Sequence, residues 1–163
     1  MPQPEAGDFA KLGELIRDIG IALLTTVDEE GRFHTRPVQT LEFDANRMLW
    51  FFTDRGSPKA DELRRDQRVS LGYADPSKHT YAAVSGIATL VHDPAKAREL
   101  WTLEQRAYYP EGPQDPRLAL LRVQIERAEY WIAAGRISYL LAAARAALSG
   151  VPIAVIGENR KID

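Results

Sequence analysis

The chain has 163 residues, a formal net charge of −2 and no cysteine. The near-neutral charge argues against nucleic acid as a partner, because no excess of Lys and Arg is available to neutralise phosphates. Without cysteines, disulfides, thiolate catalysis and cysteine-ligated metals are excluded, and the three histidines lack the spacing of metal ligands. We read no secretory signal and no apolar run long enough to span a membrane, so we expect a cytoplasmic protein without a metal or membrane partner.

The first part of the chain predicts a helix followed by strands joined by tight turns. Residues 8–19 carry apolar side chains at helical spacing. Residues 21–27 and 33–43 are rich in strand formers, and Pro37 marks an edge or an irregular stretch in the second strand. Residues 48–53 predict a third strand that is apolar on both faces. Such a strand must be covered twice, its outer side by a helix or by a second subunit.

The rest of the chain predicts more strands and three further helices. After a short helix, a long strand over residues 79–92 has a bulge predicted at Gly86. The loop with Tyr108 and Tyr109 is predicted to pack on the barrel, and the polar tail GENRKID to be frayed. The other predicted elements are helices over 58–65, 93–103 and 136–148, a strand over 68–74, and one strand or a broken pair within 118–131.

Strands joined by tight turns pair in antiparallel fashion, and only about six are available. The sequence therefore predicts one mainly β (α+β) domain over residues 1–163, with a core over about 8–148. We expect a six-stranded antiparallel barrel with helices packed around it, assembled as a homodimer. A doubly wound nucleotide-binding fold is excluded, because long crossover helices and G-x-G-x-x-G are both missing.

The short helix predicted over residues 58–65 has a lysine in its first turn, where the helix dipole disfavours a positive charge. The first N–H groups of a helix lack partners and the helix dipole is positive there, so Lys59 is unfavourable unless an anion binds. Free N–H groups, the hydroxyl of Ser57 as N-cap and an ammonium together make a phosphate site. The alternative is a solvated lysine that is neutralised by Asp61 and Glu62.

The apolar strand over residues 48–53 leads directly into this helix. A planar apolar ring with a phosphate tail could lie along such a strand, with backbone groups reading its polar edge. Arg36, next to Pro37 on the neighbouring strand, is either a second contact to the phosphate or ring edge or a surface charge. The residues alone leave both roles of Arg36 open.

Several stretches match a known family in their order and spacing. They are HTRPV (34–38), LWFFTDRGSPKADELRRDQRVSLGYAD (49–75), VSGIATLVHD (84–93), LW and YYPEG (100–101 and 108–112) and AEYW (128–131). On these stretches the chain resembles the FMN-binding split-barrel superfamily of pyridoxamine 5'-phosphate-oxidase-like proteins, in particular its general stress protein branch. The resemblance implies FMN bound at the interface of a homodimer.

The resemblance also implies which residues hold the cofactor. The arginine strand and the F-[FY]-T strand would contact the isoalloxazine, the Ser and Lys of the following helix the phosphate, and the partner subunit would supply a tryptophan and a polar contact. For Trp131 a core aromatic is the alternative. The implied cofactor-binding residues are Arg36, Pro37, Val38, Gln39, Phe51, Phe52, Thr53, Ser57, Lys59, Tyr81 and Trp131.

The chain departs from true pyridoxamine phosphate oxidases at two places. Those enzymes carry a lysine shortly after the arginine, where this chain has Gln39 and Thr40, and a histidine signature after the last tryptophan, where it has IAAGR. We therefore expect no pyridoxal phosphate synthesis. The remaining functions are an FMN-dependent oxidoreductase using reduced nicotinamide and an unknown acceptor, a flavin-binding or buffering stress protein, a deazaflavin-binding relative, and a barrel with an empty pocket. No residue stands out as a catalytic acid or base.

Overall fold

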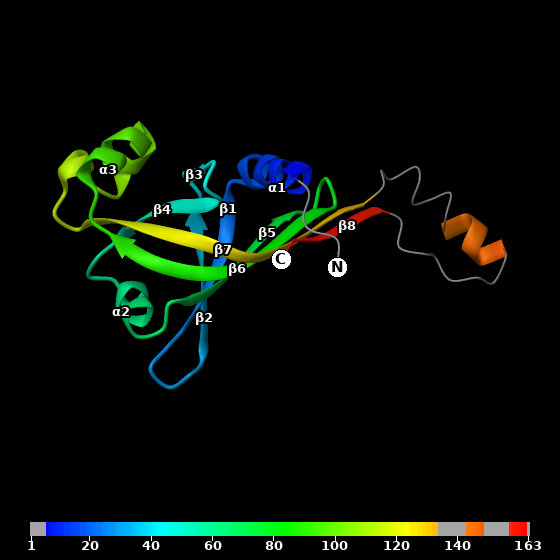
Figure 1. Ribbon diagram of the computed structural model, residues 1–163, viewed down its shortest axis with the longest axis horizontal. Helices are drawn as coiled ribbons and strands as arrows, with labels where there is room; N and C mark the ends of the chain where they lie inside the picture. Colours follow the sequence, from blue (N-terminus) through cyan, green and yellow to red (C-terminus); the bar gives the residue numbers. More distant parts are fainter. Residues whose placement is uncertain (1–5, 134–142, 149–156, 163) are drawn as a thin grey trace.

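The computed structural model describes residues 6–133, 143–148 and 157–162. It is mainly antiparallel β-sheet with helices packed outside (Figure 1). Of the helix predicted over 136–148, only 143–148 is among the described residues, and it is helical. The elements are α1 (Ala6–Ile19), β1 (Ile21–Val27), β2 (Phe33–Gln39), β3 (Glu42–Phe43), β4 (Met48–Asp54), α2 (Pro58–Arg65), β5 (Arg68–Asp75), β6 (Thr80–Val91), α3 (Pro94–Leu100), the 3-10 helices η1 (Leu103–Ala107) and η2 (Gly112–Gln114), β7 (Leu118–Ala133) and β8 (Gly157–Ile162).

Within the described residues, one eight-stranded sheet follows the order β2-β1-β5-β6-β7-β4-β3, with β8 added to β7. The two ends of this path, β2 and β3, are consecutive in the chain. The link between them is held on both sides, because the N–H of Thr40 donates to the carbonyl of Gly20 at 2.8 Å and that of Leu41 to the carbonyl of Trp50 at 2.9 Å. The sheet therefore curls until its two ends meet, which makes a barrel.

The strand count of six predicted from sequence is wrong for two reasons. The strand predicted over 33–43 is divided at the link into β2 and β3. The polar tail predicted to be frayed forms β8 instead, paired with β7 from Ala128↔Ile162 to Ala133↔Gly157. Ile162 is 1% exposed in the barrel core, and the hydroxyl of Tyr130 donates to Glu158 at 3.0 Å. Backbone pairing and one buried side chain therefore order a segment whose other residues are polar.

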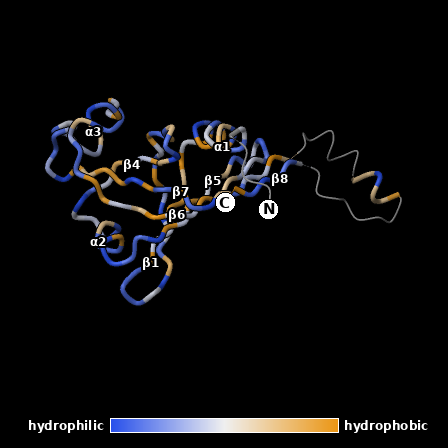
Figure 2. The backbone as a smooth tube through the Cα atoms, in the orientation of Figure 1, coloured by the Kyte–Doolittle hydropathy of each residue, from blue (hydrophilic) through white to orange (hydrophobic). Residues whose placement is uncertain are grey.

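Apolar side chains line the inside of the barrel, where strands alternate between buried and exposed residues. On β5, Val69, Leu71 and Tyr73 point inward, and the residues between them are exposed or nearly so. Leu12 and Ile16 of α1 are fully buried against this core. Figure 2 shows the apolar stretches following the central strands. Because one face of each strand is buried in this core, the register of the strands is fixed, and with it the position at which each strand ends.

The predicted bulge at Gly86 is confirmed by a register shift between Ser85 and Gly86 in the β6–β7 ladder. A Cβ added at Gly86 would overlap the carbonyl oxygen of Gln124 on β7. Only glycine fits this close approach of two backbones. The shift lets the two longest strands of the sheet keep pairing over their full length around the barrel.

The outer face of β4 is covered by the chain itself. Trp50, with Phe52 packed beside it, belongs to a second apolar cluster that includes Ala97 of α3, Tyr109, and Leu120 of β7. The helix predicted up to residue 103 ends at Leu100, and Trp101 and Tyr109 of the segment that follows complete the cover. Cover by a helix, one of the two alternatives for this strand, is therefore present within the chain.

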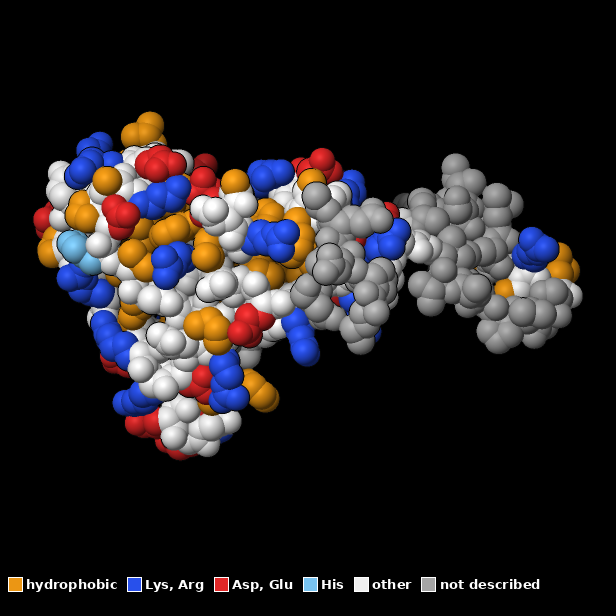
Figure 3. Space-filling view, in the orientation of Figure 1, with side chains coloured by type: hydrophobic (Ala, Val, Ile, Leu, Met, Phe, Trp, Pro, Cys, Tyr) orange, Lys and Arg blue, Asp and Glu red, His pale blue; other side chains and the backbone are white. Residues whose placement is uncertain are grey.

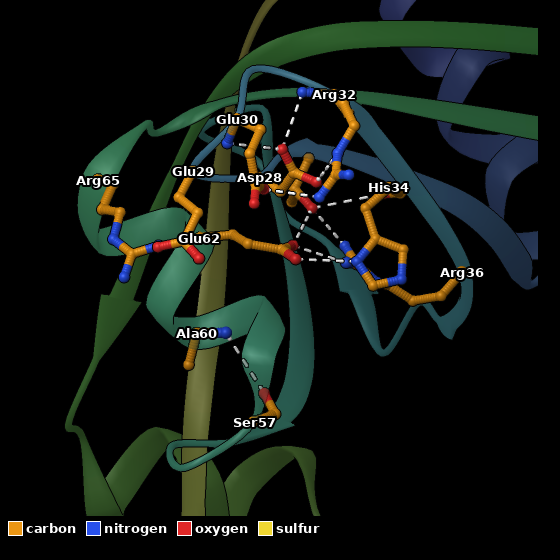
Figure 4. Close-up of polar contacts among 11 residues, drawn as sticks. Asp28, Glu29, Glu30, Arg32, His34, Arg36, Ser57, Ala60, Glu62 and Arg65 are labelled. Atoms are coloured by element: carbon orange, nitrogen blue, oxygen red, sulfur yellow. Dashed lines mark hydrogen bonds and ion pairs between the residues drawn. The ribbon is translucent and has the colours of Figure 1, made fainter.

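A buried carboxylate anchors α2 to the barrel (Figure 4). Glu62 accepts hydrogen bonds from Thr26 at 2.5 Å and from Nη2 of Arg36 at 2.6 Å through one oxygen, and contacts Nδ1 of His34 at 2.8 Å through the other. The side chain of Glu62 is 8% exposed and that of Arg36 18%. Burial alone would raise the pKa of Glu62, but the hydrogen bonds from Thr26, His34 and Arg36 outweigh it and lower this pKa to about 2.

Replacing Glu62 by Gln should lower the free energy of unfolding at neutral pH by about 3 kcal/mol, because Arg36 would keep its buried charge without a counter-ion. The native pKa of Glu62 is below its unfolded value, so its contribution is complete above pH 4.5 and is lost as the pH falls toward about 2. Urea unfolding at several pH values should therefore show the gap between wild type and Glu62→Gln closing in acid. The exposed Asp61→Asn, on the same helix, is the control. An equal loss from both variants would contradict the anchoring role.

Candidate functional site

A cavity of about 300 Å³ lies where the two ends of the sheet meet, between β2, β4, the start of α2 and η1. The described β2 and β4 do not pair with each other, and the link residue Leu41 lines the space between them. The cavity therefore follows from the way in which the barrel closes. Its lining consists of Ile21, Pro37, Val38, Gln39, Leu41, Phe52, Lys59, Gln105, Tyr108 and Tyr109.

Aromatic side chains form one wall of this cavity. Phe52 of β4 contacts Trp101, with ring centroids 5.8 Å apart, and meets Tyr109 edge-on at 6.4 Å. Tyr109 is buried, as the predicted packing of its loop requires, whereas Tyr108 is 72% exposed. Burial, and then the charge of Asp54, raise the pKa of Tyr109 to about 12, so its phenol stays protonated at neutral pH. Such a wall suits a flat apolar ring.

Lys59 lines the same cavity and is half-buried. Both carboxylates that could have neutralised it are bound elsewhere, since Asp61 pairs with Arg64 at 2.6 Å and Glu62 with Arg36 at 2.6 Å. Within the part of the chain that the structure describes, no hydrogen bond or ion pair reaches the ammonium of Lys59. The alternative of a lysine neutralised by Asp61 and Glu62 is therefore wrong.

The electrostatic surroundings of Lys59 disfavour its positive charge. Burial lowers the pKa of Lys59, the guanidinium of Arg36 lowers it further, and Asp54 opposes them. A cation in this state gains stability from any anion that enters the cavity, because the anion replaces the water and the counter-ion that the ammonium lacks. The site is thus built to attract a negative group at the start of α2.

Two predicted hydroxyls, those of Ser57 and Thr53, precede α2 without lining the cavity. Ser57 is the predicted N-cap, and its Oγ accepts from the N–H of Ala60 at 3.3 Å and donates to the carbonyl of Asp54 at 2.7 Å. Thr53 is 2% exposed, and its Oγ1 finds no hydrogen-bond partner among the described residues. Thr53 is next to Phe52 on β4, so its side chain lies on the face of the strand opposite the cavity wall.

The structure gathers five of the predicted site residues around the cavity: Pro37, Val38, Gln39, Phe52 and Lys59.

The other predicted residues lie outside the lining. Arg36 is close enough to influence Lys59, but its guanidinium is bound to Glu62 and Thr26. Phe51 is 1% exposed in the barrel core. Tyr81 and Trp131 face each other across β6 and β7, on the outer side of the sheet. Trp131 is half-buried and is not part of either apolar core cluster.

Sequence reasoning missed Gln105, a buried polar residue of η1, and the apolar residues Ile21 and Leu41. The repeated tyrosines of the loop were a usable signal for Tyr109, since aromatic side chains bury a large apolar area. No local signal marks Gln105. Its stretch, LEQRA, has the composition of an exposed turn.

A second cavity, of about 330 Å³, lies between α3, η2 and β7 and includes Arg55, His92 and Gln114 in its lining. No predicted site residue belongs to it. On the face seen in Figure 3, Lys and Arg side chains are interspersed with Asp and Glu. Over residues 6–133, 143–148 and 157–162 there is no group of metal-binding side chains, and no helix has both the length and the apolar character needed to cross a membrane.

Known proteins share both sequence and fold with this chain. Protein bli-3 of Neurospora crassa is 28% identical over 123 residues, which are 70% of this chain and 58% of that protein. The pyridoxine/pyridoxamine 5'-phosphate oxidase of Cronobacter sakazakii is 32% identical over 96 residues, 59% of this chain and 39% of the enzyme. The chain thus spans less than two thirds of the length of either relative.

Two solved structures illustrate the likeness in three dimensions. The general stress FMN/FAD binding protein of Xanthomonas citri has a TM-score of 0.66 and 29% identity, covering 77% of this chain and 88% of that one. General stress protein 26 of Jannaschia sp. CCS1 has a TM-score of 0.77 at 21% identity, covering 97% and 99%; at that identity the match shows the fold. Since the family described as pyridoxamine 5'-phosphate oxidase like matches residues 7–152, most of the chain, the protein belongs to that family.

Proposed function

We propose that the protein binds FMN, with the isoalloxazine against the Phe52 wall of the cavity and the phosphate at Lys59. The observation that carries this proposal is a half-buried cation at the start of α2 that no ion pair reaches among the described residues, next to an apolar cavity with an aromatic wall. Helix N-termini stabilise anions, and the ammonium adds a charge-assisted hydrogen bond. The Xanthomonas citri relative, described as an FMN/FAD binding protein, supports a flavin in this family.

The residues present fit such a group. No ion pair reaches Lys59 among the described residues, and the cavity lining offers Phe52 and Tyr109 to a flat ring. The ring would supply hydride and electron transfer when bound, while this chain would bind it, orient it and exclude water. A deazaflavin offers a similar ring and phosphate, and the mass and absorbance spectrum of whatever small molecule co-purifies distinguishes it from FMN and FAD.

We propose further that the protein, with flavin bound, is an oxidoreductase that uses reduced nicotinamide. One observation favours a second candidate, a stress protein that holds flavin without turnover. Of the side chains that line the cavity, the ionisable ones are Lys59, Tyr108 and Tyr109, and the buried Tyr109 has its pKa raised to about 12. The lining therefore offers no carboxylate or imidazole as a proton donor or acceptor, and any redox step would rely on the flavin itself.

We propose a homodimer that forms through the outer face of β2, β1, β5 and β6, and not through the outer face of β4 that the sequence analysis considered. Pro37, Leu23, Gly72 and Ala83 are register partners across β2, β1, β5 and β6, and form an uncharged row on the outside of the sheet. Leu23 is 54% exposed, and Ile21 on the same strand and face is 50% exposed. Ile21 and Pro37 also line the cavity. A second copy seated on this face would bury the row and close the cavity at once.

Lys59→Ala should weaken FMN binding by roughly ten- to a hundredfold, the worth of a charge-assisted hydrogen bond, and riboflavin binding by less than threefold. Riboflavin has the ring without the phosphate, so the difference isolates the phosphate contact. Quenching of flavin fluorescence during titration measures both dissociation constants. Lys11→Ala, on α1, is the control. Equal losses for the two ligands would show that Lys59 does not hold the phosphate, and no binding of FMN to the wild type would remove the proposed function.

The FMN-loaded protein should oxidise NADH or NADPH several-fold faster than the same concentration of free FMN, because a bound ring is held and oriented for hydride transfer. The loss of nicotinamide absorbance under anaerobic conditions with an added electron acceptor gives the rate. Lys59→Ala, assayed at limiting FMN, should fall toward the rate of free flavin. A wild-type rate no faster than free FMN would favour the flavin-holding candidate instead.

Leu23→Asp should convert the protein to a monomer, because it places a charge in the centre of the proposed interface. Sedimentation velocity of the FMN-loaded protein measures the change. Leu103→Asp makes the same substitution at a residue that is 81% exposed and outside the row, and should leave the dimer intact. A wild-type protein that sediments as a monomer at all concentrations would contradict the proposed assembly.

A further inference from the structure

Gln105 is a buried polar side chain that lines the cavity without an obvious structural need. It is 5% exposed, on η1, in contact with Gln39 of β2, which lines the same cavity. Its Nε2 donates to Oε1 of Gln39 at 3.2 Å. Two primary amides from segments 66 residues apart are thus placed side by side at one part of the cavity wall.

The hydrogen-bonding capacity of this amide pair is only partly used. A glutamine amide has two N–H donors and a carbonyl acceptor, and among the described residues Gln105 commits a single donor, to Gln39. Gln39 in turn reaches Oε2 of Glu104 only at 3.5 Å, the long limit for a hydrogen bond. The side-chain carbonyl of Gln105 is not one of the enclosed atoms without a partner, so it is open to the cavity. The unused donor and carbonyl of Gln105 are therefore available to a ligand in the cavity.

The position of Gln105 is fixed before any ligand arrives. Its backbone carbonyl accepts from the N–H groups of both Tyr108, at 3.0 Å, and Tyr109, at 2.9 Å. Tyr109 is in turn held edge-on against Phe52. The turn that carries Gln105 is thus tied to the aromatic wall, so the amide is preorganised relative to the surface on which a flat ring would lie.

The amide pair and the cation line the same cavity. A ligand that reaches both groups therefore needs an anion for Lys59 and, at another part of the molecule, a ring edge that can donate and accept hydrogen bonds for Gln105.

We infer that Gln105, positioned by Gln39, recognises an imide edge, that is, a ring N–H flanked by carbonyls. A primary amide presents an N–H and a carbonyl side by side, which matches a neighbouring carbonyl and N–H of such an edge in a two-point contact. The inference rests on the proposed function, and it makes Gln105 a specificity-determining residue for the ring. Flavins and deazaflavins share this edge, whereas rings without a donor between carbonyls are rejected.

The test compares FMN with N3-methyl FMN, in which the imide donor is replaced by a methyl group. Wild type should bind FMN about tenfold more tightly than the methylated ligand. Gln105→Met, of similar length and without polar atoms, should bind FMN about tenfold more weakly than wild type does, and should barely distinguish the two ligands. Gln114→Met, at a glutamine that lines the cavity between α3, η2 and β7, should behave as wild type. Fluorescence titration and a thermal melt are recorded for each variant.

Equal weakening of both ligands by Gln105→Met, or no weakening at all, would overturn the role of Gln105 as reader of the ring edge. Should that variant fail to fold, Gln39→Met removes the positioning contact from an exposed residue, and it should reduce the discrimination against the methylated ligand by about threefold. Retention of full discrimination in Gln39→Met would also overturn the inference. If Lys59→Ala weakens FMN binding as expected while Gln105→Met leaves FMN binding unchanged, the proposed function stands and only this inference fails.

Discussion

The candidate site depends on a charge balance within one short helix. α2 carries two carboxylates, and each is already held by an arginine, Asp61 by Arg64 and Glu62 by Arg36. Lys59 is left half-buried, at the positive end of the helix, with its pKa lowered by burial and by Arg36. A charge in this position raises the free energy of the folded protein unless an anion arrives. Ligand binding and stability are therefore coupled, because an anion that binds only the native state stabilises it.

Barrel closure decides which side chains meet this cation. The sheet begins with β2 and ends with β3, and the link through Leu41 brings β2 opposite β4 without pairing them. The space between the two strands is the cavity, and it is covered by Gln105 of η1 and by Tyr109, which follows η1 in the chain. The long loop that covers the outer face of β4 is thus also the loop that furnishes part of the lining. One packing arrangement builds both the core around Phe52 and the site.

Elements with local signals could be predicted from sequence. The cap Ser57 accepts from the N–H of Ala60 at 3.3 Å, and the bulge lies at Gly86, because both depend on the residue itself and its immediate neighbours. The strand β8 could not be predicted in this way. Its residues are polar apart from Ile162, and its order comes from pairing with β7, a contact that the sequence pattern of the tail does not encode. Strand pairing between distant segments is the part of the fold that periodicity cannot supply.

The site and the assembly likewise combine features that have a local signal in the sequence with features that depend on packing between distant segments. Lys59 was found because a cation in the first turn of a helix conflicts with the dipole, a contradiction visible in a few residues. Gln105 was not found, since its burial arises from the packing of η1 against β2 and β4. The doubly apolar β4 correctly predicted an outer cover but could not distinguish a helix from a subunit. Since α3 and the segment with Tyr109 supply that cover, the homodimer that we propose would be held instead by the exposed face around Leu23. That face borders the cavity through Ile21 and Pro37, so assembly and ligand binding would depend on each other.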